Sequence, residues 1–175
     1  RLPFLSIQGV FPMPDHADQQ NVRIAIIGAG AVSDYHPVPG IRIDPRATLV
    51  AACDTSESLL DERKTQWSID KLTTDYQEIC DDPEIDAVII ATPNFTHCPI
   101  AVAAAQAGKH VMCEKPLGLD AAEVQQMLDA AETAGVVHMA AFTYRFAPAM
   151  RYLKQLASTG QLGELRHFRS QRFLD

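Results

Sequence analysis

The sequence predicts an α/β protein built on a doubly wound parallel β-sheet, followed by only the first strand of a second, α+β domain. Short apolar runs alternate with longer segments of helical period from residue 21 onward. From Gly163 to Leu174, charged and apolar residues alternate instead, as in a strand with one face in water. We therefore expect an N-terminal extension over residues 1–20, one domain over residues 21–147 and the start of another over residues 148–175.

The individual elements follow from these patterns. A strand that helices cover on both faces is apolar without alternation. Five runs meet that description: Val22–Gly28, Ala47–Cys53, Ala87–Ala91, His110–Cys113 and Val136–Ala141. The predicted helices between and after them are Ser56–Gln66, Tyr76–Cys80, Thr96–Ala107, Ala121–Ala134 and Pro148–Leu156. Asp120 is placed to cap the fourth helix, and Gly108 and Gly135 follow two helix ends, where left-handed residues are common.

Composition excludes several classes of function. The 175 residues carry a formal net charge of −7 with scattered basic residues, so we expect no nucleic-acid partner. No apolar run approaches the roughly 18 residues that span a bilayer, and residues 1–20 lack the pattern of a signal peptide. The four cysteines form no C-x-x-C pair and the histidines do not cluster, which predicts neither disulfides nor a metal site. This usage is typical of a cytoplasmic protein.

The first predicted strand leads into the sequence Gly28-Ala29-Gly30-Ala31-Val32-Ser33, a G-x-G-x-x-S pattern. Gly28 permits a tight turn, and Gly30 leaves room for a pyrophosphate against the backbone. The N–H groups at the start of the next helix, at Ala31 and Val32, are free to bind it. The pattern predicts a dinucleotide-binding loop; the alternative is a glycine-rich turn without a ligand.

Asp54 ends the second predicted strand, near the spacing of about 20 residues expected for the acid that binds the adenosine ribose hydroxyls. Its carboxylate would repel a 2′-phosphate, and the following Thr55 and Ser56 offer no arginine to bind one. We therefore predict NAD in preference to NADP. The alternative interpretation makes Asp54 the cap of the helix that follows.

Several longer motifs resemble one family. They are GAGAVSDYH (28–36), ACDTS (52–56), ATPNFTH (91–97), AGKHVMCEKPL (107–117) and YRFAPAMR (144–151). From Val22 to Asp175 the chain resembles the Gfo/Idh/MocA oxidoreductases, which include glucose–fructose oxidoreductase and inositol dehydrogenase. The resemblance implies an N-terminal Rossmann domain that binds NAD or NADP. It also implies a C-terminal α+β domain whose large open sheet binds a sugar or polyol and forms homo-oligomers.

The same resemblance implies roles for individual residues. Thr92, Asn94 and His97 would line the cofactor cleft, Glu114 and Lys115 would reach the nicotinamide ribose, and Arg145 would lie near the nicotinamide. Thr92 and Glu114 follow predicted parallel strands, whose carboxyl ends are where open α/β sheets bind ligands. The alternatives are a turn and helix cap at residues 92–94 and a histidine on a helix surface at His97.

Lys115 is the candidate catalytic residue that the resemblance implies. A cation at that place can hydrogen-bond the substrate hydroxyl and stabilise its developing negative charge or relay its proton. The alternative is a solvated lysine before a proline turn. Family members complete catalysis with an Asp and a His one helical turn apart, and no Asp-x-x-x-His pair follows Arg145. We therefore expect either part of a sugar or polyol dehydrogenase, catalytically incomplete on this chain, or a stand-alone NAD-binding module.

Overall fold

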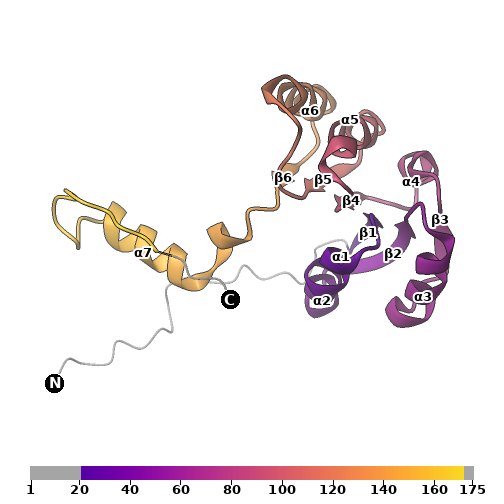
Figure 1. The fold of residues 1–175 in the computed structure, drawn as a ribbon, viewed down its shortest axis with the longest axis horizontal. Helices are drawn as coiled ribbons and strands as arrows, with labels where there is room; N and C mark the ends of the chain where they lie inside the picture. The colour runs from indigo at the N-terminus through magenta and orange to yellow at the C-terminus, as the bar shows by residue number, and fades with distance from the viewer. Residues whose placement is uncertain (1–20, 172–175) are drawn as a thin grey trace. The chain divides into compact units, whose positions relative to one another are not determined.

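The structure is a computed structural model that describes residues 21–171, so the expected extension over residues 1–20 lies outside the described residues. The chain divides into two compact units, one up to Ala87 and the other from Val88, and Figure 1 labels their helices and strands. Each unit contains parallel strands joined through helices. The expected doubly wound α/β fold is confirmed.

The first unit has the strand order β3-β2-β1. Its elements are β1 (Val22–Ile27), α1 (Ala31–Tyr35), α2 (Pro37–Ile43), β2 (Ala47–Cys53), α3 (Glu57–Trp67), β3 (Lys71–Thr73) and α4 (Tyr76–Asp81). β1 runs parallel to β2 from Val22 opposite Ala47 to Ile27 opposite Cys53. The side chains in the second half of both strands are buried, so the sheet core lies just below the loops that follow β1 and β2.

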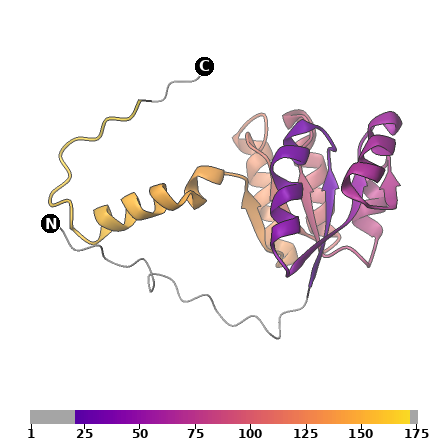
Figure 2. The same ribbon diagram turned by 90° about the horizontal axis from the view of Figure 1, so that it is seen from below.

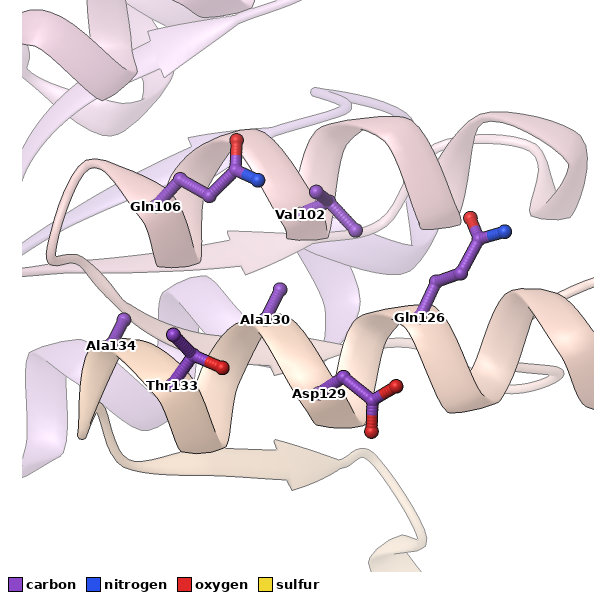
Figure 3. A pocket seen from close by; sticks show the side chains of 7 residues that line it. All are labelled: Val102, Gln106, Gln126, Asp129, Ala130, Thr133 and Ala134. Atoms are coloured by element: carbon purple, nitrogen blue, oxygen red, sulfur yellow. The ribbon is translucent and has the colours of Figure 1, made fainter.

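The second unit has the strand order β4-β5-β6. Its elements are β4 (Ala87–Ile90), the 3₁₀ turn η1 (Asn94–Thr96), α5 (His97–Gln106), β5 (His110–Cys113), α6 (Ala121–Ala134), β6 (His138–Ala140), the 3₁₀ turn η2 (Thr143–Phe146) and α7 (Pro148–Ser158). Helices α5 and α6 lie side by side, and small side chains such as Ala130 and Ala134 leave an open groove between them (Figure 3).

The helix ends agree with the sequence signals. The Asp120 carboxylate accepts a hydrogen bond of 2.9 Å from the Glu123 N–H, which confirms the predicted cap of α6. Gly108 and Gly135 have φ angles of 78° and 67° just past α5 and α6, so both adopt the left-handed conformation expected there. No helix within residues 21–171 has the length and apolarity to cross a bilayer.

Three elements of the first unit were not predicted individually. β3 has only three residues, Lys71, Leu72 and Thr73, and a single apolar side chain among them gives no apolar run to recognise. α2 contains Pro37, Pro39 and Gly40, which usually indicate a turn. Both prolines lie in its first turn, where the backbone N–H has no partner within the helix, so the helix forms despite them. α1 is short and runs almost directly into α2.

The predicted strand Gly163–Leu174 is wrong over the residues that the structure describes. Residues 164–171 form no helix or strand, and the rest of that segment lies outside the described range. An alternating pattern becomes a strand only when its backbone groups pair with a neighbour, and no strand within residues 21–171 pairs with this segment. α7, just before it, buries none of its side chains, and Figure 2 shows it as one continuous helix. The start of a second domain at residue 148 stays a prediction.

Exposed apolar side chains are concentrated between residues 137 and 168. They include Val137, Met139, Phe142, Tyr144, Phe146, Met150, Tyr152, Leu153, Leu162, Leu165 and Phe168. Because so much apolar surface in one segment favours association, we expect the 175-residue polypeptide to self-associate as its concentration rises in light scattering.

The variant with Phe142, Phe146 and Met150 all changed to Ser should self-associate much less. Ile43→Ser, which removes an exposed side chain of the first unit, is the matched control and should change little. A stable monomer of the unmodified polypeptide at high concentration would contradict this prediction.

Candidate functional site

The glycine loop begins where β1 ends, and its first residue requires glycine. Gly28 has a φ of 98°, in the left-handed region that side chains disfavour, and its N–H donates to the Cys53 carbonyl at 2.8 Å. Ser33, which stands in place of the third glycine or alanine, is fully buried, and its hydroxyl donates to the Gly28 carbonyl at 2.5 Å. The serine therefore fits the packing position and also closes the loop.

Gly30 has no conformational need to be glycine. Its φ is −69° and its ψ is −173°, which any residue adopts, and apart from its two chain neighbours no atom of the described residues lies within 4 Å of the place a Cβ would take. A side chain would therefore fit as far as the described chain is concerned. The open space above Gly30 is what the close approach of a pyrophosphate requires, so these residues fit a dinucleotide.

Asp54 lies directly after β2, and its carboxylate supports the same loop. One oxygen accepts from the Ala29 N–H at 2.8 Å, and the other accepts from the Ser56 N–H at 3.0 Å. The residue that caps α3 is Ser56, whose hydroxyl accepts from the Leu59 N–H, so the alternative role of Asp54 as that cap is wrong. Each carboxylate oxygen keeps a further lone pair for a ribose hydroxyl.

Helix α3 also contacts the loop and the helix after it. The Arg63 Nε donates to the Ala29 carbonyl at 3.0 Å. The Trp67 indole N–H and the Gln66 amide donate to the Asp34 carboxylate at 2.8 and 3.0 Å. No motif or spacing in the sequence predicted these contacts. Leu60, Arg63 and Trp67 share the buried face of α3 at helical spacing, so an arginine on an apolar face was the available signal.

In the second unit, the loop after β4 is organised around His97. The ring of His97 is 1% exposed, and its two nitrogens lie 2.9 Å from the Pro116 carbonyl and 2.8 Å from the Thr92 carbonyl. The alternative of a surface histidine is wrong. The Thr92 hydroxyl accepts from the Thr96 hydroxyl at 2.7 Å, and Asn94 begins the turn η1. His97 thus joins the loop after β4 to the loop after β5.

The loop after β5 carries Glu114 and Lys115. The Glu114 N–H donates to the Ile90 carbonyl at 2.9 Å, which fixes this residue at the carboxyl end of β4 and β5. Lys115 is exposed, and its ammonium group has no hydrogen bond or ion pair within residues 21–171. The peptide bond from Lys115 to Pro116 is cis. Because the Lys115 ammonium group lacks partners among the described residues, it is available to a ligand at this edge of the sheet.

Arg145 takes no part in these hydrogen bonds. It belongs to η2, its side chain is exposed, and no hydrogen bond within the described part of the chain joins it to Glu114 or Lys115. The structure thus brings together Gly28, Gly30 and Asp54 in the first unit, and Thr92, His97 and the loop of Lys115 in the second. The roles of all these residues toward a cofactor stay predictions.

The four cysteines are free and buried. Burial raises the pKa of the Cys53 and Cys113 thiols to about 12, and burial also raises the pKa of Cys98. Thiols that stay protonated at neutral pH are poor nucleophiles and metal ligands, which agrees with a packing role. Across residues 21–171, no three side chains of the metal-binding types come together.

Comparison with known proteins agrees with this arrangement. Residues 22–142 match the sequence model of the Gfo/Idh/MocA family, described as an oxidoreductase family with an NAD-binding Rossmann fold. Since this match covers more than half of the chain, the protein belongs to that family of NAD-binding oxidoreductases.

Individual relatives include dehydrogenases of sugars and polyols. Levoglucosan dehydrogenase of Pseudarthrobacter phenanthrenivorans is 36% identical over 162 residues, covering 86% of this chain and 40% of that protein. The structure of scyllo-inositol dehydrogenase from Lactobacillus casei, with bound NAD(H) and scyllo-inositol, is 31% identical with a TM-score of 0.76. That match covers 83% of this chain and 43% of the other.

A Synechocystis biliverdin reductase structure, in complex with biliverdin and NADP+, is 31% identical with a TM-score of 0.69, covering 82% and 44% of the two chains. The chain spans about two fifths of the length of the curated relatives that it matches. These relatives differ in cofactor and in substrate. The cofactor and substrate of this chain must therefore be inferred from its own residues.

The second prediction follows from the hydrogen bonds to Asp34. The hydrogen bond from the Trp67 indole is the largest cause that lowers the pKa of Asp34 below its usual range, and the hydrogen bond from the Gln66 amide lowers it further. The pKa of an unfolded Asp is about 3.9. A carboxylate whose pKa is lower in the folded state stabilises the fold above that value, and this stabilisation is lost as the pH falls through the folded-state pKa. We expect Asp34→Asn to lower the free energy of unfolding at neutral pH, and the deficit to shrink below about pH 3.9.

Urea unfolding of both proteins across this pH range measures the difference. Asp61→Asn, which neutralises an exposed carboxylate of α3, is the control and should show no such deficit. A deficit for Asp34→Asn that stayed constant down to strong acid would show that the ionised carboxylate is not what the indole stabilises.

Proposed function

We propose that this chain is the cofactor-binding part of a dehydrogenase that transfers hydride between NAD and a hydroxyl of a sugar or polyol. The observation that carries the proposal is Gly30, whose backbone angles permit any residue and whose Cβ position faces open space. A glycine that the protein itself does not need is explained by a ligand that approaches the backbone closely. When bound, NAD supplies the hydride acceptor or donor.

On the adenosine side, the roles follow from the first unit. The loop at Gly28, Gly30, Ala31 and Val32 takes the pyrophosphate, because the Gly30, Ala31 and Val32 N–H groups have no acceptor within residues 21–171. Asp54 accepts hydrogen bonds from the adenosine ribose hydroxyls with its remaining lone pairs. Its negative charge disfavours the 2′-phosphate of NADP, which supports NAD as the preferred cofactor.

On the nicotinamide side, the second unit supplies the residues. We assign Thr92, Asn94 and Glu114 to the cofactor, and Arg145 to the neighbourhood of the nicotinamide. Since both ring nitrogens of His97 face backbone carbonyls, we assign it to shaping the cleft from beneath rather than to direct contact. Lys115, whose ammonium group has no partner within the described residues, donates a hydrogen bond to the substrate hydroxyl and holds or relays its proton.

Substrate and surroundings are proposed from the same observations. The dehydrogenases of levoglucosan and scyllo-inositol among the relatives support a sugar or polyol as substrate. The net charge of −7 supports the absence of a nucleic-acid partner, and four buried free thiols support a cytoplasmic protein. Assembly into homo-oligomers through a C-terminal sheet is proposed from the family resemblance.

The third prediction tests the cofactor. Calorimetry should show that the chain binds NAD at least tenfold more tightly than NADP, because Asp54 repels the added phosphate. Asp54→Asn keeps an acceptor for the Ala29 N–H but removes the charge, so it should bring the two affinities within about threefold, mainly by weakening NAD.

The control is Asp61→Asn, an exposed carboxylate on α3 that should leave both affinities unchanged. Equal affinities of the unmodified chain for NAD and NADP would remove the role of Asp54 in cofactor choice. Asp54→Ala should weaken NAD further than Asp54→Asn, because it also releases the Ala29 N–H.

The fourth prediction separates binding from chemistry. The 175-residue polypeptide should bind NAD but show no turnover on a panel of sugars and polyols, because no Asp-x-x-x-His pair follows Arg145. In a protein that carries this chain followed by a C-terminal α+β domain, Lys115→Ala should lower kcat by a factor of roughly 10² to 10⁴. Cofactor affinity should change much less.

Lys154→Ala, on the exposed helix α7, is the matched control and should leave kcat unchanged. Turnover by the short polypeptide would show that its catalytic set is complete. An extended protein that binds NAD without turnover on any substrate would favour the alternative of a binding module.

A further inference from the structure

We propose that Arg63, Gln66 and Trp67 form a clamp on α3 that holds the glycine loop in the shape that binds a pyrophosphate, with Arg63 as the positioning residue. We call these three residues the α3 clamp. The inference rests on the proposed NAD-binding function and deepens it, because it names the residues that set the loop rather than those that touch the cofactor.

The first step is the double support of Ala29. The Asp54 carboxylate accepts from the Ala29 N–H at 2.8 Å, and the Arg63 Nε donates to the Ala29 carbonyl at 3.0 Å. The two peptide groups that join Gly28, Ala29 and Gly30 are therefore each held by a charged side chain. The two charges have opposite signs, and each matches the polarity of the group that it holds.

The second step follows from peptide geometry. In a planar trans peptide, the carbonyl and the N–H point in opposite directions. Since the Ala29 carbonyl points at Arg63, the N–H of Gly30 in the same peptide points away from α3. That N–H has no acceptor within residues 21–171, and the space beside Gly30 is open. Arg63 thus aims a free N–H donor toward the place where a pyrophosphate oxygen would lie.

The third step concerns the other side of Gly30. The Asp34 carboxylate accepts from the Trp67 indole at 2.8 Å and from the Gln66 amide at 3.0 Å, and the Asp34 N–H donates to the Gly30 carbonyl at 3.3 Å. α3 therefore holds the chain both before Gly30, at Ala29, and after it, at Asp34.

The fourth step is the charge of Arg63. This residue is 8% exposed; its guanidinium hydrogen-bonds Gln66, lies 5.4 Å from the centre of the Trp67 ring, and pairs at 3.2 Å with Glu62, whose side chain is 66% exposed. An exposed carboxylate compensates a buried cation only in part. The Asp34 carboxylate also interacts with this charge, so we assign the effect of Arg63 to the direction of its hydrogen bond with the Ala29 carbonyl.

Trp67 is the only tryptophan of the chain, which makes the clamp observable. Its indole bonds Asp34 and its ring lies beside the Arg63 guanidinium, so its fluorescence reports on both contacts. ADP-ribose, which carries the pyrophosphate but no nicotinamide, should change the Trp67 emission of the unmodified protein. Adenosine, which lacks the pyrophosphate, should change it little.

The test compares Arg63→Gln and Arg63→Lys with the matched control Lys64→Gln, which alters an exposed residue of the same helix. Calorimetry with NAD and ADP-ribose, and ligand-observed NMR with adenosine, give the affinities. Arg63→Gln should weaken NAD and ADP-ribose by about tenfold or more and leave adenosine within about twofold. Arg63→Lys should recover part of the loss, because it restores the charge but not the geometry of the Nε donor.

Every outcome of this comparison supports or overturns the α3 clamp. Arg63 variants that fold by circular dichroism and bind ADP-ribose as the unmodified protein does would overturn the clamp while leaving the proposed function intact. An equal loss for adenosine and ADP-ribose would also overturn it, since it would show a general structural effect. If Arg63→Gln fails to fold, Arg63→Lys and Trp67→Phe give the same comparison. No NAD binding by the unmodified protein would overturn the proposed function, and this inference with it.

Discussion

The hydrogen bond from the Ala29 N–H to Asp54 is the contact on which the first unit's candidate site depends. It ties the loop after β1 to the residue after β2, and these strands are parallel neighbours whose carboxyl ends meet at one edge. Arg63 completes the support from α3, and the Ser33 hydroxyl closes the loop onto Gly28. The protein thereby orders a short, glycine-rich segment whose buried residues, Gly28, Ala29 and Ser33, have small side chains.

The second unit solves a similar problem with an imidazole ring in place of a carboxylate and a guanidinium. Two loops follow β4 and β5, and the buried ring of His97 lies between a carbonyl of each. Because the ring packs between the Thr92 and Pro116 carbonyls, it links the loop after β4 to the loop after β5. In both units, side chains behind the loops hold backbone groups in place, and the exposed groups in front remain available to a ligand.

Apolar runs and helical periodicity were enough to find five of the six strands and the main helices, because buried parallel strands and amphipathic helices leave clear patterns. These patterns missed β3, which offers no apolar run, and α2, whose prolines lie harmlessly in its first turn. The alternation of charged and apolar residues after Gly163 predicted a strand that does not form over the described residues. Strand formation depends on a pairing partner, which local sequence does not reveal.

The same limit applies to the site. Motif spacing identified Gly28, Gly30 and Asp54, but not Arg63 or the second contact of Asp54, because hydrogen bonds across the fold follow from tertiary packing. The buried position of His97 was likewise not visible in the sequence, where a lone histidine near a helix start is typical of a surface.

A crystal structure of the chain with NAD tests the central claim most directly. We expect the pyrophosphate over Gly30, with an oxygen at hydrogen-bond distance from the Gly30 N–H. We also expect the adenosine ribose hydroxyls on the Asp54 carboxylate while it still holds Ala29. NAD bound elsewhere, or with its ribose away from Asp54 and its pyrophosphate away from Gly30, would contradict the proposed binding site.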